Sequence, residues 1–161
     1  MKRKIIITIT LILISCLCVV ITINFSRPSP QPTHEKVQSI HRSIPTFTDQ
    51  QLGVLVGLAT SPKWLRQNIA ANQLVYGIVK PSDTVPTGVA DYSYLVTTDN
   101  QNGTVIFFKE EGQSVVIKYS FQQNEKLKSK KLSLSQLDEE YYRTVSQKRK
   151  VEDYVARLRT E

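Results

Sequence analysis

Residues 92–121 read YSYLVTTDNQNGTVIFFKEEGQSVVIKYSF, and this stretch decides the fold. Apolar and polar side chains alternate along it, which is typical of strands with one buried face. The alternation is interrupted by Asn102-Gly103, a strong hairpin signal, and by the turn residues 110–113. These signals predict three strands joined by short turns, an antiparallel meander, and the apolar run 74–79 can add a fourth strand.

Helical patterns precede the meander. Thr48 and Gln51 fit a capping box that opens a helix running to about residue 60. Ser61 and Pro62 fit the N-cap and the first position of a second helix. We therefore expect two helices before the sheet.

The segment after the meander is polar and then helical. Residues 124–131 read as a cationic loop, and residues 132–134 are apolar enough for a short edge strand. Ser135 is expected to cap a helix, and the remaining pattern fits either two helices broken at Ser146-Gln147 or one long helix. The prediction is an α+β domain: N-terminal helices, an antiparallel meander of three to five strands, and C-terminal helices packed on one face.

A long apolar segment lies near the amino end. Lys2, Arg3 and Lys4 precede an uncharged apolar run over residues 5–25. As a helix, this run is about 32 Å long, enough to cross the hydrocarbon core of a bilayer. The three cations favour a cytoplasmic amino end. We therefore expect one transmembrane signal-anchor in residues 1–25, with the rest of the chain outside the cytoplasm.

Two alternatives stay open for this segment. The residues around Cys16 resemble a lipobox, in which the Cys is lipidated, although residues 17–25 stay apolar where a lipoprotein turns polar. A cleaved signal would give a secreted protein, but the run lacks a small-residue exit. Because Cys16 and Cys18 both lie here, the exported part has no Cys and is not a disulfide-stapled scaffold. Exported domains of this kind indicate a Gram-positive bacterium.

The remaining chain divides into a tether and a domain. Residues 26–45 are rich in Pro and Ser and read as an extended tether, whereas residues 46–161 form one domain. His34 and His41 both fall in the tether, so the domain has neither His nor Cys. This excludes Ser-His-Asp and Cys-His catalysis and His/Cys metal sites there. Since no glycine-rich phosphate loop occurs either, we expect no metal and no cofactor.

Carboxylates are the remaining catalytic candidates. Asp83, Asp91 and Asp99 flank the first strand of the meander, and paired carboxylates can come from distant segments. The alternative function is therefore a small carboxylate-dependent hydrolase acting on an envelope substrate. Because loop carboxylates commonly cap turns, we assign no catalytic residue.

The net charge of +7 comes from 21 Lys and Arg against 14 Asp and Glu. Beyond the anchor, the excess gathers in two clusters that are candidates for binding a polyanion: Lys126, Lys128, Lys130, Lys131, Lys148, Arg149 and Lys150. Such clusters can bind an anionic wall polymer or lipid head groups. Nucleic acid is disfavoured, because the chain lacks the aromatic and glycine signature of a binding module.

Several short motifs carry a family resemblance: Gly53-Val54-Leu55-Val56, Ser61-Pro62-Lys63-Trp64, Tyr92-Ser93-Tyr94, Val116-Ile117-Lys118-Tyr119, Leu132-Ser133-Leu134 and Tyr141-Tyr142. Together they resemble a small exported domain of lactobacilli, found in lipoproteins and membrane-anchored hypothetical proteins. The resemblance covers most of residues 47–158. It implies the same exported domain and no reaction, ligand or site residue.

We therefore expect a membrane-tethered extracytoplasmic domain that binds a cell-envelope polymer or protein partner without catalysis. Besides the hydrolase, a structural subunit of an envelope complex remains an alternative.

Overall fold

The computed structural model describes residues 44–99 and 103–161. The predicted anchor at 5–25, the lipidation candidate Cys16 and the tether up to residue 43 lie outside these ranges, so the structure leaves them as predictions. Within the described ranges, no helix is long and apolar enough to cross a membrane.

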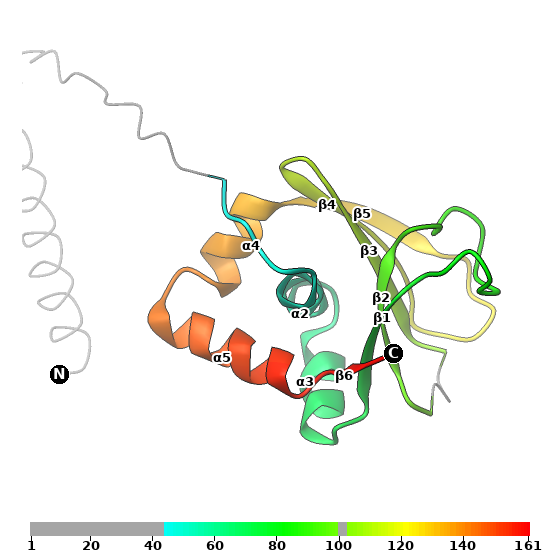
Figure 1. The fold of residues 1–161 in the computed structure, drawn as a ribbon, viewed down its shortest axis with the longest axis horizontal. Coiled ribbons are helices and arrows are strands. Elements are labelled where there is room, and N and C mark those ends of the chain that lie inside the picture. The colour runs from blue at the N-terminus through cyan, green and yellow to red at the C-terminus, as the bar shows by residue number, and fades with distance from the viewer. Residues whose placement is uncertain (1–43, 100–102) are drawn as a thin grey trace, which may run out of the picture. The chain divides into compact units, whose positions relative to one another are not determined.

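The described chain runs through two helices, five strands, two further helices and a short strand. The elements are α2 (Asp49–Thr60), α3 (Pro62–Ala70), β1 (Leu74–Ile78), β2 (Ser93–Thr97), β3 (Val105–Glu111), β4 (Ser114–Ser120), β5 (Lys128–Ser133), α4 (Leu134–Tyr141), α5 (Val145–Ala156) and β6 (Arg159–Thr160). Figure 1 shows the helices on one side of the sheet, so the domain is α+β as predicted.

The sheet has six strands in the order β5-β4-β3-β2-β1-β6. The five strands β1 to β5 pair antiparallel, as the alternation predicted. The predicted sheet was nevertheless incomplete, because β6 pairs parallel with β1 and makes the sheet mixed. β6 has only two residues, and its partner β1 is far away in sequence, so no local sequence pattern predicts it.

The predicted loop at residues 124–131 is wrong over its second half. β5 begins at Lys128 and pairs with β4 from Tyr119↔Lys128 to Ser114↔Ser133. It is an edge strand, and lysines on an edge strand discourage pairing with another chain. The strand runs directly into α4, which Ser133 caps rather than Ser135: the backbone N–H of Gln136 donates to Ser133 Oγ at 3.1 Å.

The C-terminal region contains two helices, and the break lies earlier than Ser146-Gln147. α4 ends at Tyr141, and Thr144 caps α5. The backbone N–H of Gln147 donates to Thr144 Oγ1 at 3.2 Å, and the N–H of Thr144 donates to Gln147 Oε1 at 2.8 Å. This capping box has the same Thr-x-x-Gln pattern that correctly located the start of α2.

α2 is the centre of the helix layer. All residues from Leu52 to Leu58 are buried, because the sheet and the other three helices surround them. The helix lies very close to its neighbours. A Cβ added at Gly53 would lie 2.9 Å from Phe108 Cζ, and one at Gly57 would lie 2.6 Å from Leu65 Cδ1.

Polar contacts fix the first turn of α2 to the rest of the domain. Asp49 Oδ2 accepts hydrogen bonds from the hydroxyls of Tyr76 on β1 and Ser93 on β2. Gln51 Nε2 donates to Glu152 Oε1 on α5 at 2.7 Å. The helix layer and the sheet are therefore tied together at this end.

The opposite face of the sheet carries a second, smaller core. The segment from Val79 to Tyr92 leaves the end of β1 and folds back, and the backbone N–H of Val79 donates to Tyr92 O at 2.9 Å. Val79, Val89 and Tyr92 form a buried cluster with Phe107 of β3. We call residues 79–92 the covering loop. It shields the middle of this face and leaves a hollow on each side.

Candidate functional site

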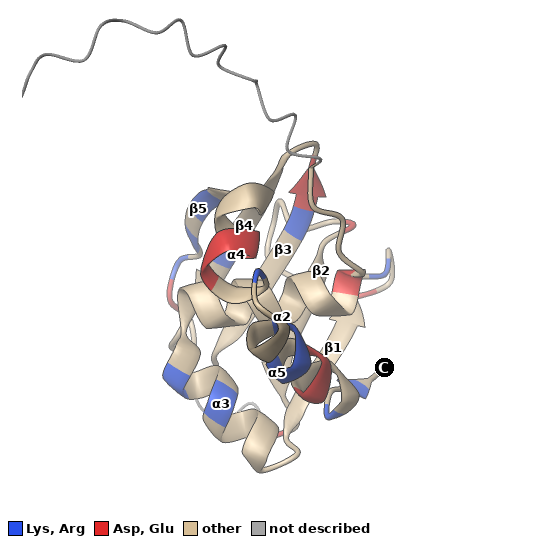
Figure 2. Cartoon of the chain, turned by 90° about the vertical axis from the view of Figure 1, so that its left-hand side faces the viewer, with Lys and Arg blue, Asp and Glu red and all other residues tan. Residues whose placement is uncertain are grey.

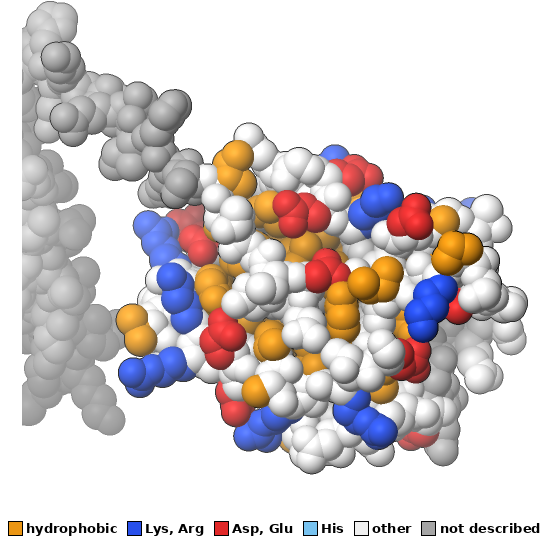
Figure 3. Space-filling view, viewed as in Figure 1, with side chains coloured by type: hydrophobic (Ala, Val, Ile, Leu, Met, Phe, Trp, Pro, Cys, Tyr) orange, Lys and Arg blue, Asp and Glu red, His pale blue; other side chains and the backbone are white. Residues whose placement is uncertain are grey.

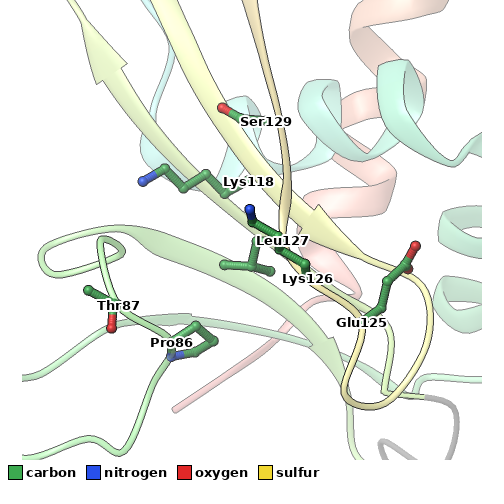
Figure 4. Close-up of a pocket in the computed structure, with 7 residues that line it drawn as sticks. All are labelled: Pro86, Thr87, Lys118, Glu125, Lys126, Leu127 and Ser129. Carbon is green, nitrogen blue, oxygen red and sulfur yellow. The ribbon is translucent and has the colours of Figure 1, made fainter.

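One hollow lies over β4 and β5, beside the covering loop. Its volume is about 370 Å³, and it is lined by Pro86, Thr87, Lys118, Glu125, Lys126, Leu127 and Ser129. We call it the lysine hollow. Figure 4 shows that the covering loop forms one wall and that β4, β5 and the segment between them form the other.

Lys118 joins the two walls. Its ammonium donates to the carbonyl oxygen of Gly88 at 2.6 Å and lies 5.3 Å from the ring centroid of Tyr92. Gly88 has φ +84°, and a Cβ there would lie 3.1 Å from Lys118 Nζ, so glycine allows this approach. An ammonium has three donors, so Lys118 keeps two for a ligand.

Lys126 supplies the second cation of the hollow. It is exposed and belongs to none of the salt bridges formed within residues 44–99 and 103–161. Figure 4 shows the carboxylate of Glu125 pointing away from the side of the hollow where Lys118 and Lys126 extend.

The carboxylate of the hollow is already compensated. Glu125 Oε1 lies 2.6 Å from Lys128 Nζ, and this contact is the main reason that the pKa of Glu125 is lowered. The backbone N–H of Phe121 donates to Glu125 Oε2 at 3.4 Å. The hollow therefore presents two cations and one paired anion, which suits an anionic ligand.

The structure divides the cluster Lys126–Lys131 between two faces. Lys128 and Lys130 oppose Tyr119 and Ile117 on the helix side, whereas Lys131 opposes Val116 on the other side. Lys131 pairs with Glu111 at 3.3 Å, and Lys128 with Glu125.

Lys130 is committed to the fold. Its ammonium donates to the carbonyl oxygen of Ala59 at 3.0 Å, near the C-terminus of α2, where a cation is favoured. Its partial burial lowers the pKa of Lys130. Of the four lysines predicted in this cluster, Lys126 is the one that lines the hollow, and Lys128 contributes through Glu125.

The second predicted cluster lies in the helix layer. Lys148, Arg149 and Lys150 are exposed on α5. The ammonium of Lys148 lies 5.3 Å from the ring centroid of Tyr142, and that of Lys150 lies 5.8 Å from the ring centroid of Tyr154. Figure 2 shows the basic segments of α3, α5 and β5 separated by acidic and uncharged ones.

Acidic and basic side chains are also interspersed on the face shown in Figure 3, so no extended basic surface forms there. The two predicted clusters, Lys126–Lys131 and Lys148–Lys150, therefore do not form one continuous basic surface on this face. Sequence reasoning missed Lys118, although the alternation of β4 placed it on the face opposite Ile117.

A second hollow lies on the other side of the covering loop, over β2 and β3. Its volume is about 220 Å³, and it is lined by Asp83, Val85, Tyr94, Val96, Val105, Phe107 and Glu161. We call it the acidic groove. Asp83 therefore shares a groove with Glu161, whose side chain accepts a hydrogen bond from the Tyr94 hydroxyl at 2.5 Å.

The three carboxylates predicted as catalytic candidates have separate surroundings. Asp83 caps a turn, because its Oδ2 accepts from the backbone N–H of Lys80 at 2.8 Å. Asp91 is exposed with φ +59°, and Asp99 is exposed beyond the end of β2. In the described ranges, no cluster of three or more His, Cys, Asp and Glu side chains could hold a metal ion.

A family model named Lreu_0056_like, described as a hypothetical protein, matches residues 48–159. The chain belongs to this family. The match covers α2 to β6 almost completely, so it includes all lining residues of the lysine hollow and those of the acidic groove except Glu161.

A solved relative supports the fold of this Lreu_0056_like chain. The NMR structure of a hypothetical protein from Lactobacillus reuteri is 71% identical, with a TM-score of 0.68, and the match covers 74% of this chain and 100% of that one. The predicted resemblance to a lactobacillal protein family is thus confirmed, whereas its exported character stays a prediction. No curated protein matches the chain.

Proposed function

We propose that residues 46–161 are a non-catalytic binding domain for an anionic polymer of the cell envelope. The observation that supports this proposal is the lysine hollow. Lys118 and Lys126 line it, and its one carboxylate, Glu125, is paired with Lys128. A phosphate or carboxylate of the polymer would enter beside the covering loop and accept hydrogen bonds from the two ammonium groups.

The weakness of each contact favours a polymer over a free anion. An exposed ion pair contributes about 0.2–1 kcal/mol, so two ammonium groups hold one isolated phosphate weakly. Repeated anions along one polymer, together with many tethered copies of the domain, raise the overall affinity without new contacts.

The location is part of the proposal. The apolar run 5–25, preceded by Lys2, Arg3 and Lys4, supports a signal-anchor with the domain outside the cytoplasm. Lipidation at Cys16 or release by cleavage would place the same domain at the same surface or beyond it. In each case the domain would meet wall polymers rather than nucleic acid.

The other two functions have less support. For the carboxylate-dependent hydrolase, Asp83 caps a turn and shares its groove with Glu161 rather than with Asp91 or Asp99. The lysine hollow gives no support to a structural subunit of an envelope complex, because such a role does not require a binding site for an anion.

The test uses the full chain in nanodiscs of uncharged lipid, with polyglycerol phosphate as the probe. The double substitution Lys118→Gln and Lys126→Gln should weaken binding by about 2- to 30-fold, from two contacts of about 0.2–1 kcal/mol each. Glutamine removes the charge and keeps N–H donors for Gly88, on a side chain one bond shorter than that of lysine.

The matched control removes the same charge from the helix layer, by Lys148→Gln and Lys150→Gln. It should bind the polymer like the unaltered chain. Equal loss in both double variants would show that net charge alone attracts the polymer, and no loss in the first would remove the lysine hollow as its site.

A further inference from the structure

The acidic groove differs from the lysine hollow in chemistry as well as in position. Its floor consists of apolar side chains from β2 and β3, namely Val96, Val105 and Phe107, and Val85 of the covering loop closes one side. Its polar groups are the carboxylates of Asp83 and Glu161 and the hydroxyl of Tyr94. The groove is thus negative in a chain whose net charge is +7.

Tyr94 shapes the groove because β1 has a glycine beside it. A Cβ at Gly77 would lie 2.5 Å from Tyr94 Cζ, so only glycine lets the Tyr94 ring lie across β1. The ring packs edge-on against Phe107, with 6.3 Å between centroids. On its other side the groove continues into a space of about 200 Å³, lined in part by Ile78 and Lys80.

The two carboxylates lack a cationic partner within the described ranges. Asp83 accepts from the backbone N–H of Lys80, and Glu161 accepts from the Tyr94 hydroxyl. Lys80 lines the adjoining space, but its ammonium forms none of the salt bridges of residues 44–99 and 103–161. A ligand could therefore supply a cation to both carboxylates.

The geometry points to one kind of occupant: an arginine or lysine side chain from an extended, partly apolar segment of a partner protein. Such a side chain has an aliphatic stem for the floor of Val96, Val105 and Phe107 and a cation for Asp83 and Glu161. The aromatic rings of Tyr94 and Phe107, which also line the groove, attract a cation to their faces. An anionic polymer is excluded from this groove by like charge.

The size of the acidic groove agrees with one inserted side chain, and the adjoining space of about 200 Å³ with a neighbouring part of the same segment. Small-molecule pockets usually enclose about 300–1,000 Å³. The acidic groove, at about 220 Å³, is smaller, and it is open along β2 and β3. The partner segment would lie along these strands, with one basic side chain inserted and its apolar neighbours on Val85 and Val96.

The test measures fluorescence anisotropy of a labelled peptide with the full chain in nanodiscs of uncharged lipid. The probe is the capped peptide Val-Arg-Val-Arg-Val, and it is compared with Val-Glu-Val-Glu-Val and with the version that carries citrulline for arginine. The arginine peptide should bind more tightly than either of the others, by about 2- to 30-fold relative to the citrulline peptide. Equal binding of the citrulline peptide would overturn the proposal, because citrulline keeps the shape and loses the charge.

Variants then locate the site. Asp83→Asn with Glu161→Gln should reduce binding of the arginine peptide about 2- to 30-fold, from two exposed contacts of about 0.2–1 kcal/mol each. Asn and Gln still accept from Lys80 and Tyr94, so the fold should be preserved. Glu110→Gln with Asp153→Asn, which removes the same charge from other exposed positions, should leave binding unchanged.

The two proposed sites can be separated in the same assay. The Lys118→Gln and Lys126→Gln variant should bind the arginine peptide normally, because it leaves the acidic groove intact. If that variant loses the peptide as well, or if the Glu110 and Asp153 control loses it, the acidic groove is not the site.

Discussion

Replacing Asp49 with Ala tests how the sheet and the helix layer are held together. Asp49 Oδ2 accepts hydrogen bonds from Tyr76 and Ser93, whose side chains belong to residues only 8% and 7% exposed. Asp49→Ala leaves both hydroxyls without this acceptor and removes a negative charge from the first turn of α2.

The expected cost follows from these contacts. A hydrogen bond to a charged group contributes about 1.5–3 kcal/mol. Because Asp49 is itself exposed, water lowers both contributions, and we expect a total loss of about 3 kcal/mol in the free energy of unfolding. For a domain of this size, that loss lowers the melting temperature by about 10 °C.

The assay is urea unfolding followed by circular dichroism, with Asp153→Ala as the control. Asp153 is also an exposed carboxylate, and its salt bridge with Arg157 spans 3.4 Å on the surface of α5. Its loss should cost less than about 1 kcal/mol.

A double-mutant cycle decides the cause. In a chain that already carries Tyr76→Phe and Ser93→Ala, Asp49→Ala should cost only the charge effect at the helix start, about 0.3–1 kcal/mol. The reasoning fails if Asp49→Ala costs no more than Asp153→Ala, or if its full cost persists in that background.

Two further predictions concern alkaline pH and the break between α4 and α5. Burial, followed by the hydrogen bond to Asp49, raises the pKa of Tyr76 from 10.0 to about 12, so this contribution to stability is complete below pH 10 and is lost as the pH rises through 12. Urea unfolding at increasing pH should show this decline, and Tyr76→Phe should make it shallower; an unchanged slope would contradict the assignment. Thr144→Ala removes the capping box of α5 and should cost about 1 kcal/mol, whereas Ser146→Ala, inside the exposed first turn, should cost almost nothing. Equal costs in the same unfolding assay would mean that the cap is not what separates the helices.

The two hollows on the opposite face of the sheet are lined by different charges. The covering loop lies between them, with Pro86 and Thr87 on the lysine hollow and Asp83 and Val85 on the acidic groove. If both proposals hold, a polymer and a protein partner would occupy this face together. The helix side, which holds the main core, carries neither site.

Only part of the candidate site could be predicted from the sequence. Lys126 was predicted from its charge cluster, and it lines the lysine hollow. Lys130 and Lys131 were not separable from it by sequence, because their partners Ala59 and Glu111 come from other segments, whereas Lys128 pairs with Glu125 within the same segment. Lys118 lies in an apolar strand, away from other basic residues in the sequence. A search for clusters of basic residues therefore did not select it.

The sequence alone determined the local elements. The alternation of residues 92–121 predicted β2, β3 and β4, and the pair Thr48 and Gln51 predicted the start of α2, because these signals act between residues that are close in the chain. The tertiary structure alone decided what lies side by side: β6 next to β1, the covering loop over Phe107, and Lys118 in the same hollow as Lys126. These contacts arise from burying apolar surface between distant segments, and a local pattern carries no information on which distant segment will meet it.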